Sequence, residues 1–391
     1  MASAGIDDGK LAVTIVCVTY NHEKYISDAL DSFLSQEADF RYQIFIADDC
    51  STDDTREILR KYASEHPGDI RLFLPDQNRG AERNAIEMCK QAGTSYIALC
   101  DGDDYWTDER KLQMQYDYME KHPEMRACFH DTEIEVTEGE TWFLAEDYSN
   151  TEDGKMRWCT GHKHFNKLPY YTIADYIPCG FVHSSSMFIR WNYALEVPEW
   201  YYGHILGDYP LWCLQVGLGL FGYIDETMSV YRRHNGACYN FSSREEFWGA
   251  TKPDWISIDS DLKGYFEALG APEELLTIID MRQKDDLGKL LKYAYRCRSA
   301  SIRNAVLREY SELINRYSKT SSTIGGRVDG LRYIVCVDKE FHCSRPHRIR
   351  GRLRSIARGI YQCFVREGVI RSKMLADSAL WRFLKMRSDP N

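Results

Sequence analysis

Short apolar runs alternate with amphipathic segments along the first third of the chain. The runs are rich in β-branched residues, which is typical of strands buried on both faces of a parallel sheet. They lie at residues 12–18, 42–47, 70–74 and 95–100. The intervening segments repeat apolar positions at helical spacing, and they lie at residues 24–36, 51–62, 81–91 and 108–121. This alternation predicts an α/β domain with a Rossmann-like, mostly parallel sheet flanked by helices.

The pattern changes beyond residue 130. A polar, irregular stretch at residues 134–170 predicts a long loop. Further order is expected as short strands and one helix, at residues 127–129, 185–189, 210–216 and 227–231. Helical spacing then returns over residues 254–319. We therefore expect a first domain over residues 10–240 with halves at 10–130 and 131–240, a helical region over 250–340, and a separate tail over 345–391.

Charge and cysteine usage narrow the class of protein. The chain has 391 residues and a formal net charge of −10, which counts against nucleic acid as a partner of its main body. The 13 cysteines show no paired metal-ligand spacing, so we expect reduced thiols. No basic start followed by an apolar segment and no run of about 18 apolar residues is present. These features predict a cytoplasmic location without a membrane span.

Three carboxylates follow the fourth apolar run within four positions: Asp101, Asp103 and Asp104. Neighbouring carboxylates repel one another and are costly to bury together, unless a hard cation binds their oxygens. The carboxyl ends of strands are also where open α/β sheets place ligands. The cluster predicts a Mg²⁺ or Mn²⁺ site that holds a phosphate-bearing substrate. The alternative is an acidic turn exposed to solvent.

Polar residues also follow the earlier strands. Thr19, Tyr20 and Asn21 come directly after the first strand, where nucleotides bind in parallel sheets, although turn formers explain them equally. Asp49 follows the second strand and is placed to accept a hydrogen bond from a base or ribose. Arg83 begins the third helix, where it either contacts a base or phosphate or forms an ordinary surface ion pair.

These motifs, taken in order, resemble a known family. The segments at residues 13–26, 46–53 and 101–108 are similar to those of family-2 glycosyltransferases with the GT-A fold. The run from Asp103 through Lys111 to Glu124 is similar to bacterial surface-polysaccharide glycosyltransferases of that family. The resemblance is close over residues 12–130 and looser as far as residue 236.

The resemblance implies roles for the strand-end residues. Residues 10–130 would be the nucleotide-binding half of a GT-A domain, and residues 131–240 would be its acceptor half. The loop at Thr19, Tyr20 and Asn21, together with Asp49, would hold the base and ribose of the donor, and Arg83 would assist them. Asp101 would bind the ribose side as well as the metal.

The resemblance also implies a catalytic base and a complete metal site. Family members place a carboxylate after Gly or Glu early in a helix, and Gly207-Asp208 matches that pattern, with Asp208 as the general base. The alternative is that Asp208 caps its helix. A histidine after the last strand often completes the metal or diphosphate site in the family, and His234 fits; the alternative is an ordinary loop histidine. The metal ligands would then be Asp101, Asp103 and His234, with Asp104 unassigned.

The expected function is therefore inverting, metal-dependent transfer of a sugar from a UDP-sugar to a hydroxyl group of a glycan or polyprenyl-linked acceptor. The alternatives are a sugar nucleotidyltransferase and a non-catalytic nucleotide-sugar-binding protein. The tail at residues 345–391 carries 12 Lys and Arg against three acids at nearly helical apolar spacing. It predicts peripheral contact with an anionic membrane, or else packing on the acidic body of the chain.

Overall fold

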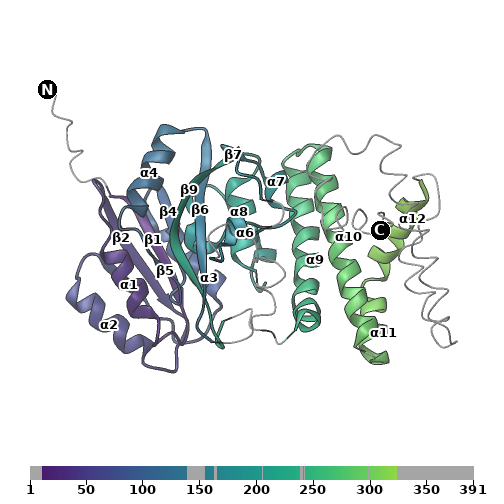
Figure 1. Ribbon diagram of the computed structural model, residues 1–391, viewed down its shortest axis with the longest axis horizontal. Helices are drawn as coiled ribbons and strands as arrows, with labels where there is room; N and C mark the ends of the chain where they lie inside the picture. The colour runs from purple at the N-terminus through teal and green to yellow at the C-terminus, as the bar shows by residue number, and fades with distance from the viewer. Residues whose placement is uncertain are drawn as a thin grey trace, which may run out of the picture. The chain divides into compact units, whose positions relative to one another are not determined.

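A computed structural model describes residues 11–138, 155–162, 165–204, 206–237, 241, 243–297 and 299–323 (Figure 1). A nine-stranded sheet forms its centre, in the order β3-β2-β1-β4-β8-β6-β9-β5, with β7 paired to β9. The strands are β1 (Leu11–Thr19), β2 (Arg41–Asp48), β3 (Ile70–Phe73), β4 (Tyr96–Leu99), β5 (Tyr105–Trp106), β6 (Met125–Val136), β7 (Tyr170–Tyr171), β8 (Phe188–Arg190) and β9 (Leu220–Arg233).

The first four strands form the parallel part of the sheet. β1 pairs in parallel with both β2 and β4, and β2 pairs in parallel with β3. β8 then runs antiparallel between β4 and β6, while β6 and β9 form a long parallel pair. The α/β class with a mixed sheet is thus confirmed. The prediction that a loop begins at residue 134 was wrong, because β6 continues to Val136.

Helices cover both faces of this sheet. They are α1 (Ile26–Leu34), α2 (Thr55–Glu65), α3 (Ala81–Ala92), α4 (Lys111–Lys121), α6 (Trp158–Gly161), α7 (Ile173–Tyr176) and α8 (Asp208–Val216), with short 3-10 turns η1 (Ser184–Ser186) and η2 (Glu199–Tyr201). In α1 the buried side chains are Ile26, Ala29, Leu30 and Phe33. This spacing places them on one helical face against the sheet.

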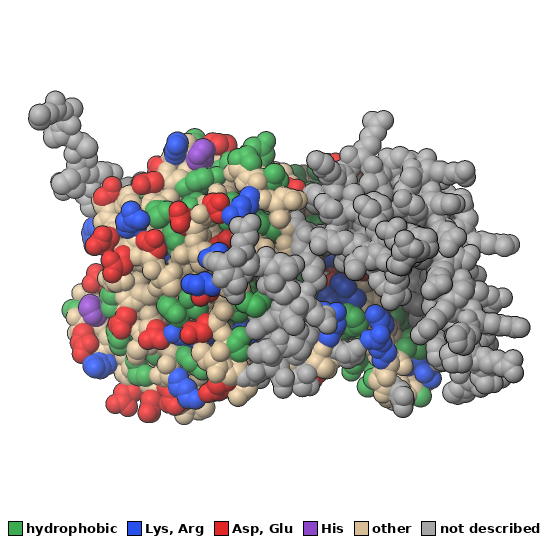
Figure 2. Space-filling view, in the orientation of Figure 1, with side chains coloured by type: hydrophobic (Ala, Val, Ile, Leu, Met, Phe, Trp, Pro, Cys, Tyr) green, Lys and Arg blue, Asp and Glu red, His purple; other side chains and the backbone are tan. Residues whose placement is uncertain are grey.

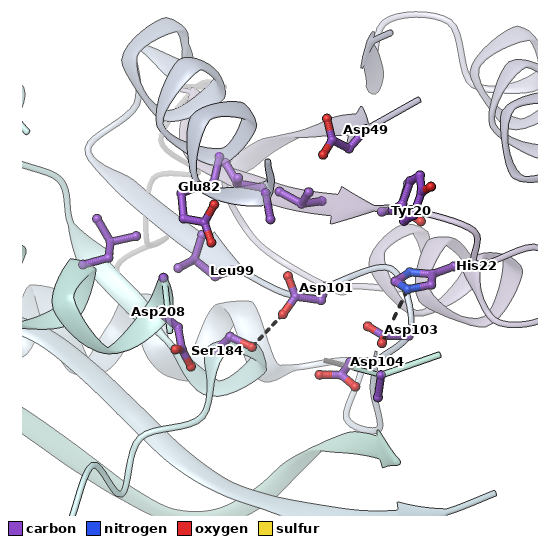
Figure 3. A pocket seen from close by; sticks show the side chains of 18 of the residues that line it. Tyr20, His22, Asp49, Glu82, Leu99, Asp101, Asp103, Asp104, Ser184 and Asp208 are labelled. Atoms are coloured by element: carbon purple, nitrogen blue, oxygen red, sulfur yellow. Dashed lines mark hydrogen bonds and ion pairs between the residues drawn. The ribbon is translucent and has the colours of Figure 1, made fainter. Parts of the chain in front are cut away.

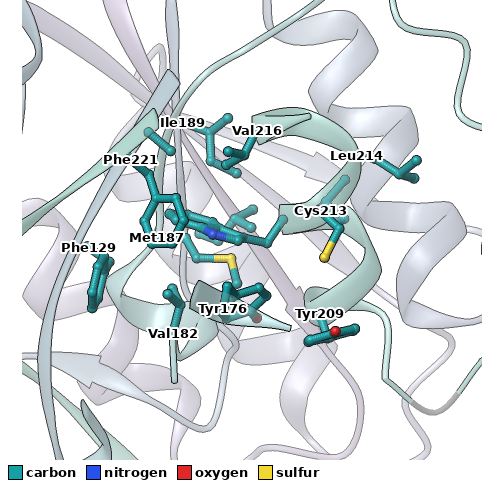
Figure 4. Packing of buried hydrophobic residues seen from close by; sticks show 14 of the residues in the cluster. Phe129, Tyr176, Val182, Met187, Ile189, Tyr209, Cys213, Leu214, Val216 and Phe221 are labelled. Atoms are coloured by element: carbon teal, nitrogen blue, oxygen red, sulfur yellow. The ribbon is translucent and has the colours of Figure 1, made fainter. Parts of the chain in front are cut away.

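The alternation of side chains in β1 separates two hydrophobic cores. Val13, Ile15 and Cys17 join the core that contains α1 and α4. Val16 faces the other core, which includes side chains of α3 and α8. Figure 4 shows the second core, where Met187 and Phe221 lie among residues of α8. This packing holds α3 and α8 on the same face of the sheet, next to the ends of β1 and β4.

The remaining described helices are α9 (Arg244–Ala268), α10 (Glu273–Arg296), α11 (Ala300–Glu309) and α12 (Ser311–Thr323). The helical character expected after residue 250 is confirmed. The chain divides into two compact units, residues 1–283 and 284–391, and the sheet belongs to the first. The predicted domain boundaries remain predictions, and the basic tail at 345–391 lies outside the described residues.

Acidic and basic side chains are interspersed on the visible surface of the sheet-containing unit (Figure 2). None of the helices within the described residues is both long enough and apolar enough to cross a lipid bilayer.

Candidate active site

A cavity of about 300 Å³ opens at the carboxyl ends of β1, β2 and β4 (Figure 3). Segments far apart in the sequence form its walls: the turn after β4, the start of α3, η1 and the start of α8. Six carboxylates line it, from Asp49, Glu82, Asp101, Asp103, Asp104 and Asp208. Like charges repel when they are buried together. Such a cavity is therefore expected to bind a cation or hydrogen-bond donors that stabilise the negative carboxylates.

Two histidines meet Asp103 at one side of the cavity. Asp103 Oδ2 lies 3.0 Å from His234 Nε2 and 3.5 Å from His22 Nε2. Burial lowers the pKa of His22 despite the opposing effect of Asp103. Burial acts to raise the pKa of Asp103, but His22 and the hydrogen bond from His234 outweigh it and lower the pKa. This favours an ionised carboxylate beside a neutral His22.

Those charge states suit a divalent cation. One ligand atom from each of His22, Asp103 and His234 lies within 4.8 Å of the others, and metal ligands must be deprotonated to bind. His22 Nδ1 is buried without a hydrogen-bond partner, so the ring is not committed elsewhere in the described structure. The three residues therefore fit a divalent metal ion, because imidazole nitrogens and carboxylate oxygens are both common metal ligands.

Asp101 faces a different neighbour. Its Oδ2 accepts a hydrogen bond from Ser184 Oγ at 2.9 Å. Burial raises the pKa of Asp101 to about 7, with a further contribution from the charge of Asp103. The sequence placed Asp101 among the metal ligands, whereas the cluster of possible ligands found in the described structure contains His22 instead.

Asp104 is bound into the framework of the fold. It is 1% exposed, and its Oδ1 accepts a hydrogen bond from the backbone N–H of Arg232 in β9 at 2.9 Å. Burial raises the pKa of Asp104 well above its ordinary value. The side chain of Asp104 thus joins the acidic turn to β9. This contact keeps Asp103 close to His234, which follows β9.

Asp208 begins α8 and lines the same cavity. Its Oδ1 accepts a hydrogen bond from the backbone N–H of Tyr209 at 2.8 Å, and burial raises its pKa. Figure 3 shows Asp101 between Asp208 and Asp103. The geometry therefore places a partly buried carboxylate of raised pKa across the cavity from the histidine cluster.

The loop after β1 is only partly turned toward the cavity. Thr19 and Tyr20 line it. Asn21 does not, because its backbone adopts a left-handed φ of 57° and its Oδ1 accepts a hydrogen bond from Thr52 N at 2.8 Å. Asn21 therefore joins this loop to the start of the segment after β2. The predicted role in nucleotide binding remains a prediction for all three residues.

Asp49 lines the cavity but also holds the start of α3. Its carboxylate accepts hydrogen bonds from Arg79 N at 2.7 Å, Gly80 N at 3.0 Å and Asn84 Nδ2 at 2.8 Å. Arg83 is directed away from the cavity.

Arg83 pairs with the exposed Glu199 at 2.8 Å and lies 4.3 Å from the ring centre of Tyr202. The surface ion pair, one of the two alternatives for Arg83, is the one present.

The cavity and cluster residues that the sequence prediction did not assign include His22, Glu82 and Ser184. His22 directly follows Asn21, so its position after a strand was a usable signal. Glu82 shares the start of α3 with Arg83, so its position was also a usable signal. Ser184 carried no such signal, because only the folded chain brings η1 to the cavity.

Comparisons with known proteins identify the family to which the first part of the chain belongs. Residues 14–189 match the family model described as Glycosyl transferase family 2. An uncharacterised protein of Mycobacterium tuberculosis is 31% identical over 247 residues, which are 60% of this chain and 63% of that protein. The chain thus spans less than two thirds of that relative.

A Staphylococcus aureus protein, poly(ribitol-phosphate) beta-N-acetylglucosaminyltransferase TarS, is 31% identical over 98 residues, covering 25% of this chain and 17% of that one. The crystal structure of S. aureus TarS 1–349 in complex with UDP-GlcNAc aligns with a TM-score of 0.45 at 16% identity, covering 77% of this chain and 92% of that one. The match at residues 14–189 includes the motifs around Asp49 and Asp103, and it confirms the predicted family: the chain carries a glycosyltransferase family 2 domain.

Proposed function

We propose that the chain is an inverting glycosyltransferase that transfers a sugar from a UDP-sugar to a hydroxyl group of a glycan or polyprenyl-linked acceptor in surface-polysaccharide synthesis. One observation carries the proposal: Asp208 and the turn that bears Asp103, which lies within the family-2 match at residues 14–189, line a single cavity. The similarity to TarS, a poly(ribitol-phosphate) beta-N-acetylglucosaminyltransferase, supports a polymeric acceptor.

Asp208 is proposed as the general base. Transfer to a hydroxyl group requires removal of its proton, and a carboxylate of raised pKa accepts a proton more readily than an ordinary aspartate. Burial gives Asp208 that raised pKa. In this proposal the acceptor hydroxyl lies on the side of Asp208, and the diphosphate of the donor lies toward Asp103. The hydroxyl oxygen would attack the anomeric carbon and displace the nucleoside diphosphate in one step, which inverts the anomeric centre.

His22, Asp103 and His234 are proposed to hold a divalent metal ion, Mn²⁺ or Mg²⁺. When bound, the ion would offset the negative charge that develops on the diphosphate. Asp101, hydrogen-bonded to Ser184, lies beside this cluster and is proposed to contact the ribose. Thr19, Tyr20 and Asp49 would border the nucleoside.

Donor binding and turnover test these roles. Wild-type protein should gain thermal stability from UDP in the presence of Mn²⁺, and a panel of UDP-sugars with candidate acceptors should identify a substrate. Asp208→Asn should keep UDP binding and lose turnover by at least about a hundredfold, whereas Asp103→Asn should lose the Mn²⁺-dependent part of the stabilisation.

Asp54→Asn is the matched control, because Asp54 is an exposed residue at the start of α2 outside the cavity. UDP binding with no turnover of any donor would favour a non-catalytic binding protein. Wild-type turnover by Asp208→Asn would reject Asp208 as the base.

A cytoplasmic location and membrane contact through residues 345–391 also remain proposals. Flotation with anionic vesicles, comparing the full chain with a 1–344 truncation at low and high salt, tests the tail directly. Equal flotation of the two proteins would reject membrane contact through this segment.

A further inference from the structure

Glu82 and Gly207 meet on the cavity wall that bears the proposed base. Glu82 lies in the first turn of α3, and Gly207 directly precedes Asp208. A Cβ atom placed on Gly207 would lie 2.7 Å from Glu82 Cγ and 3.1 Å from Glu82 Oε1. Contacts of 2.7 Å are closer than carbon atoms tolerate. The absence of a side chain at position 207 therefore leaves the space that Glu82 occupies.

The position of Glu82 is fixed by its helix. Asp49 accepts hydrogen bonds from the backbone N–H groups of Arg79 and Gly80, just before α3. Figure 3 shows the Glu82 side chain reaching from α3 toward Leu99 and the cavity. Because the start of the helix is held in this way, Glu82 is presented to the cavity by the framework and not by a mobile loop.

The carboxylate of Glu82 has capacity left for a ligand. Among the described residues, its hydrogen bond is to its own backbone N–H, and burial raises its pKa. The nearby His204 is already paired with Asp254 at 2.6 Å. A second polar group of the cavity, the hydroxyl of Thr19, is buried without a partner. Buried polar atoms without partners are uncommon and indicate a ligand or water that completes them.

We propose that Glu82 is a specificity-determining residue that accepts hydrogen bonds from hydroxyl groups of the transferred sugar, and that the cavity selects uncharged sugars over hexuronic acids. The inference rests on the proposed function and names its donor class. Hydrogen bonds from hydroxyl groups to a carboxylate are stronger than those between neutral groups. The carboxylate of a hexuronic acid would instead lie near Glu82, Asp101 and Asp208 on the cavity walls. Repulsion between these like charges would weaken the binding of hexuronic acids relative to uncharged sugars.

Matched donors test this assignment by calorimetry with Mn²⁺ present. UDP-glucose and UDP-glucuronic acid differ only at C6, and UDP alone reports the nucleotide contacts. Wild-type protein should bind UDP-glucose at least about tenfold more tightly than UDP-glucuronic acid. Glu82→Gln should weaken UDP-glucose binding by about tenfold, the difference between a charged and a neutral hydrogen bond. The same variant should show a smaller preference for UDP-glucose over UDP-glucuronic acid, and its affinity for UDP should be unchanged.

Glu57→Gln is the control, since Glu57 is also a first-turn glutamate but is exposed on α2, and it should bind all three ligands as wild type does. Equal binding of both sugars by wild-type protein, an unchanged Glu82→Gln variant, or a variant that also loses UDP affinity would overturn the inference. Failure of wild-type protein to bind UDP would refute the proposed function instead.

A double-mutant cycle gives a second test of the contact. Gly207→Ala should weaken UDP-glucose binding in the wild-type background, because the added methyl group displaces Glu82. In a Glu82→Ala background the same change should have little further effect on binding, since no Glu82 side chain remains to be displaced. Equal losses in the two backgrounds would show that Gly207 acts independently of Glu82 and would overturn the assignment.

Discussion

Asp104 separates structural from chemical roles within the acidic turn. The structure has Asp104 buried and hydrogen-bonded to the backbone of Arg232, while Asp103 faces two histidines. We therefore expect Asp104 to stabilise the fold and Asp103 to serve the reaction. The informative changes are Asp104→Ala and Asp104→Asn, compared with Asp103→Asn.

The magnitude for Asp104→Ala follows from its partner. Removing the carboxylate leaves the backbone N–H of Arg232 without its acceptor, and a buried unsatisfied donor costs about 1–3 kcal/mol. In Asp104→Asn the amide oxygen can still accept this bond. Burial and the charges of Asp103 and Asp101 oppose ionisation of Asp104, so the neutral amide replaces a carboxyl group whose charged form is already disfavoured. The free energy of unfolding of Asp104→Asn should therefore stay within about 1 kcal/mol of wild type.

Urea unfolding followed by circular dichroism, together with donor turnover, checks this prediction. Asp104→Ala should unfold at lower urea, and Asp104→Asn should retain turnover within about tenfold of wild type. Asp103→Asn should show the reverse, with unchanged stability and lost turnover. If Asp104→Asn abolished turnover at unchanged stability, Asp104 would be a ligand or reacting group, and its assignment as an anchor would be refuted.

Three further predictions concern pH and packing. Burial raises the pKa of Asp208, so turnover should rise with pH along an acid limb centred above about pH 4, and a pH–rate profile with a lower limb would contradict its role as base. Burial lowers the pKa of Lys111 to about 7. Between about pH 7 and pH 10 the unfolded chain therefore binds more protons than the folded chain, and the free energy of unfolding should rise by up to about 1.4 kcal/mol per pH unit. Urea unfolding of Lys111→Met over this range should lack that contribution to the slope. Gly102→Ala would place a Cβ 2.7 Å from Thr19 Cβ and 2.9 Å from Ile26 Cδ1, which should cost about 1–3 kcal/mol in thermal or urea unfolding.

The parallel part of the fold was predictable because β1, β2 and β4 contain runs of consecutive buried residues. A continuous apolar run predicts such a strand whichever strands it pairs with. β1 to β4 all lie within or near the predicted ranges. The remaining strands of the sheet were harder to predict. β5 is two residues long and depends on β9, which lies more than a hundred residues away. β6 and β9 are longer than their apolar runs because each completes the other's hydrogen bonding.

The carboxylates of the site were predictable for a related reason. In a parallel sheet, residues that follow successive strands reach the same edge, so Asp49, Asp101 and Asp103 had to lie close together. Which way each side chain turns was not predictable from this rule. Asp104 differs from Asp103 by one position, yet one is bonded to β9 and the other faces the histidines.

The same limit applies to α3, where the sequence favoured Arg83 and the structure has Glu82 lining the cavity. Arg83 was the chemically attractive residue, because a cation suits a diphosphate or a base. Consecutive residues on a helix point about 100° apart, so only one of Glu82 and Arg83 can face the cavity. Asp49 settles which one, because it holds the first turn of α3 in place through Gly80 N, and this directs Glu82 inward and Arg83 toward Glu199. The residue proposed to select the sugar is therefore determined by a hydrogen bond between two strand-to-helix connections, which the residue types alone do not specify.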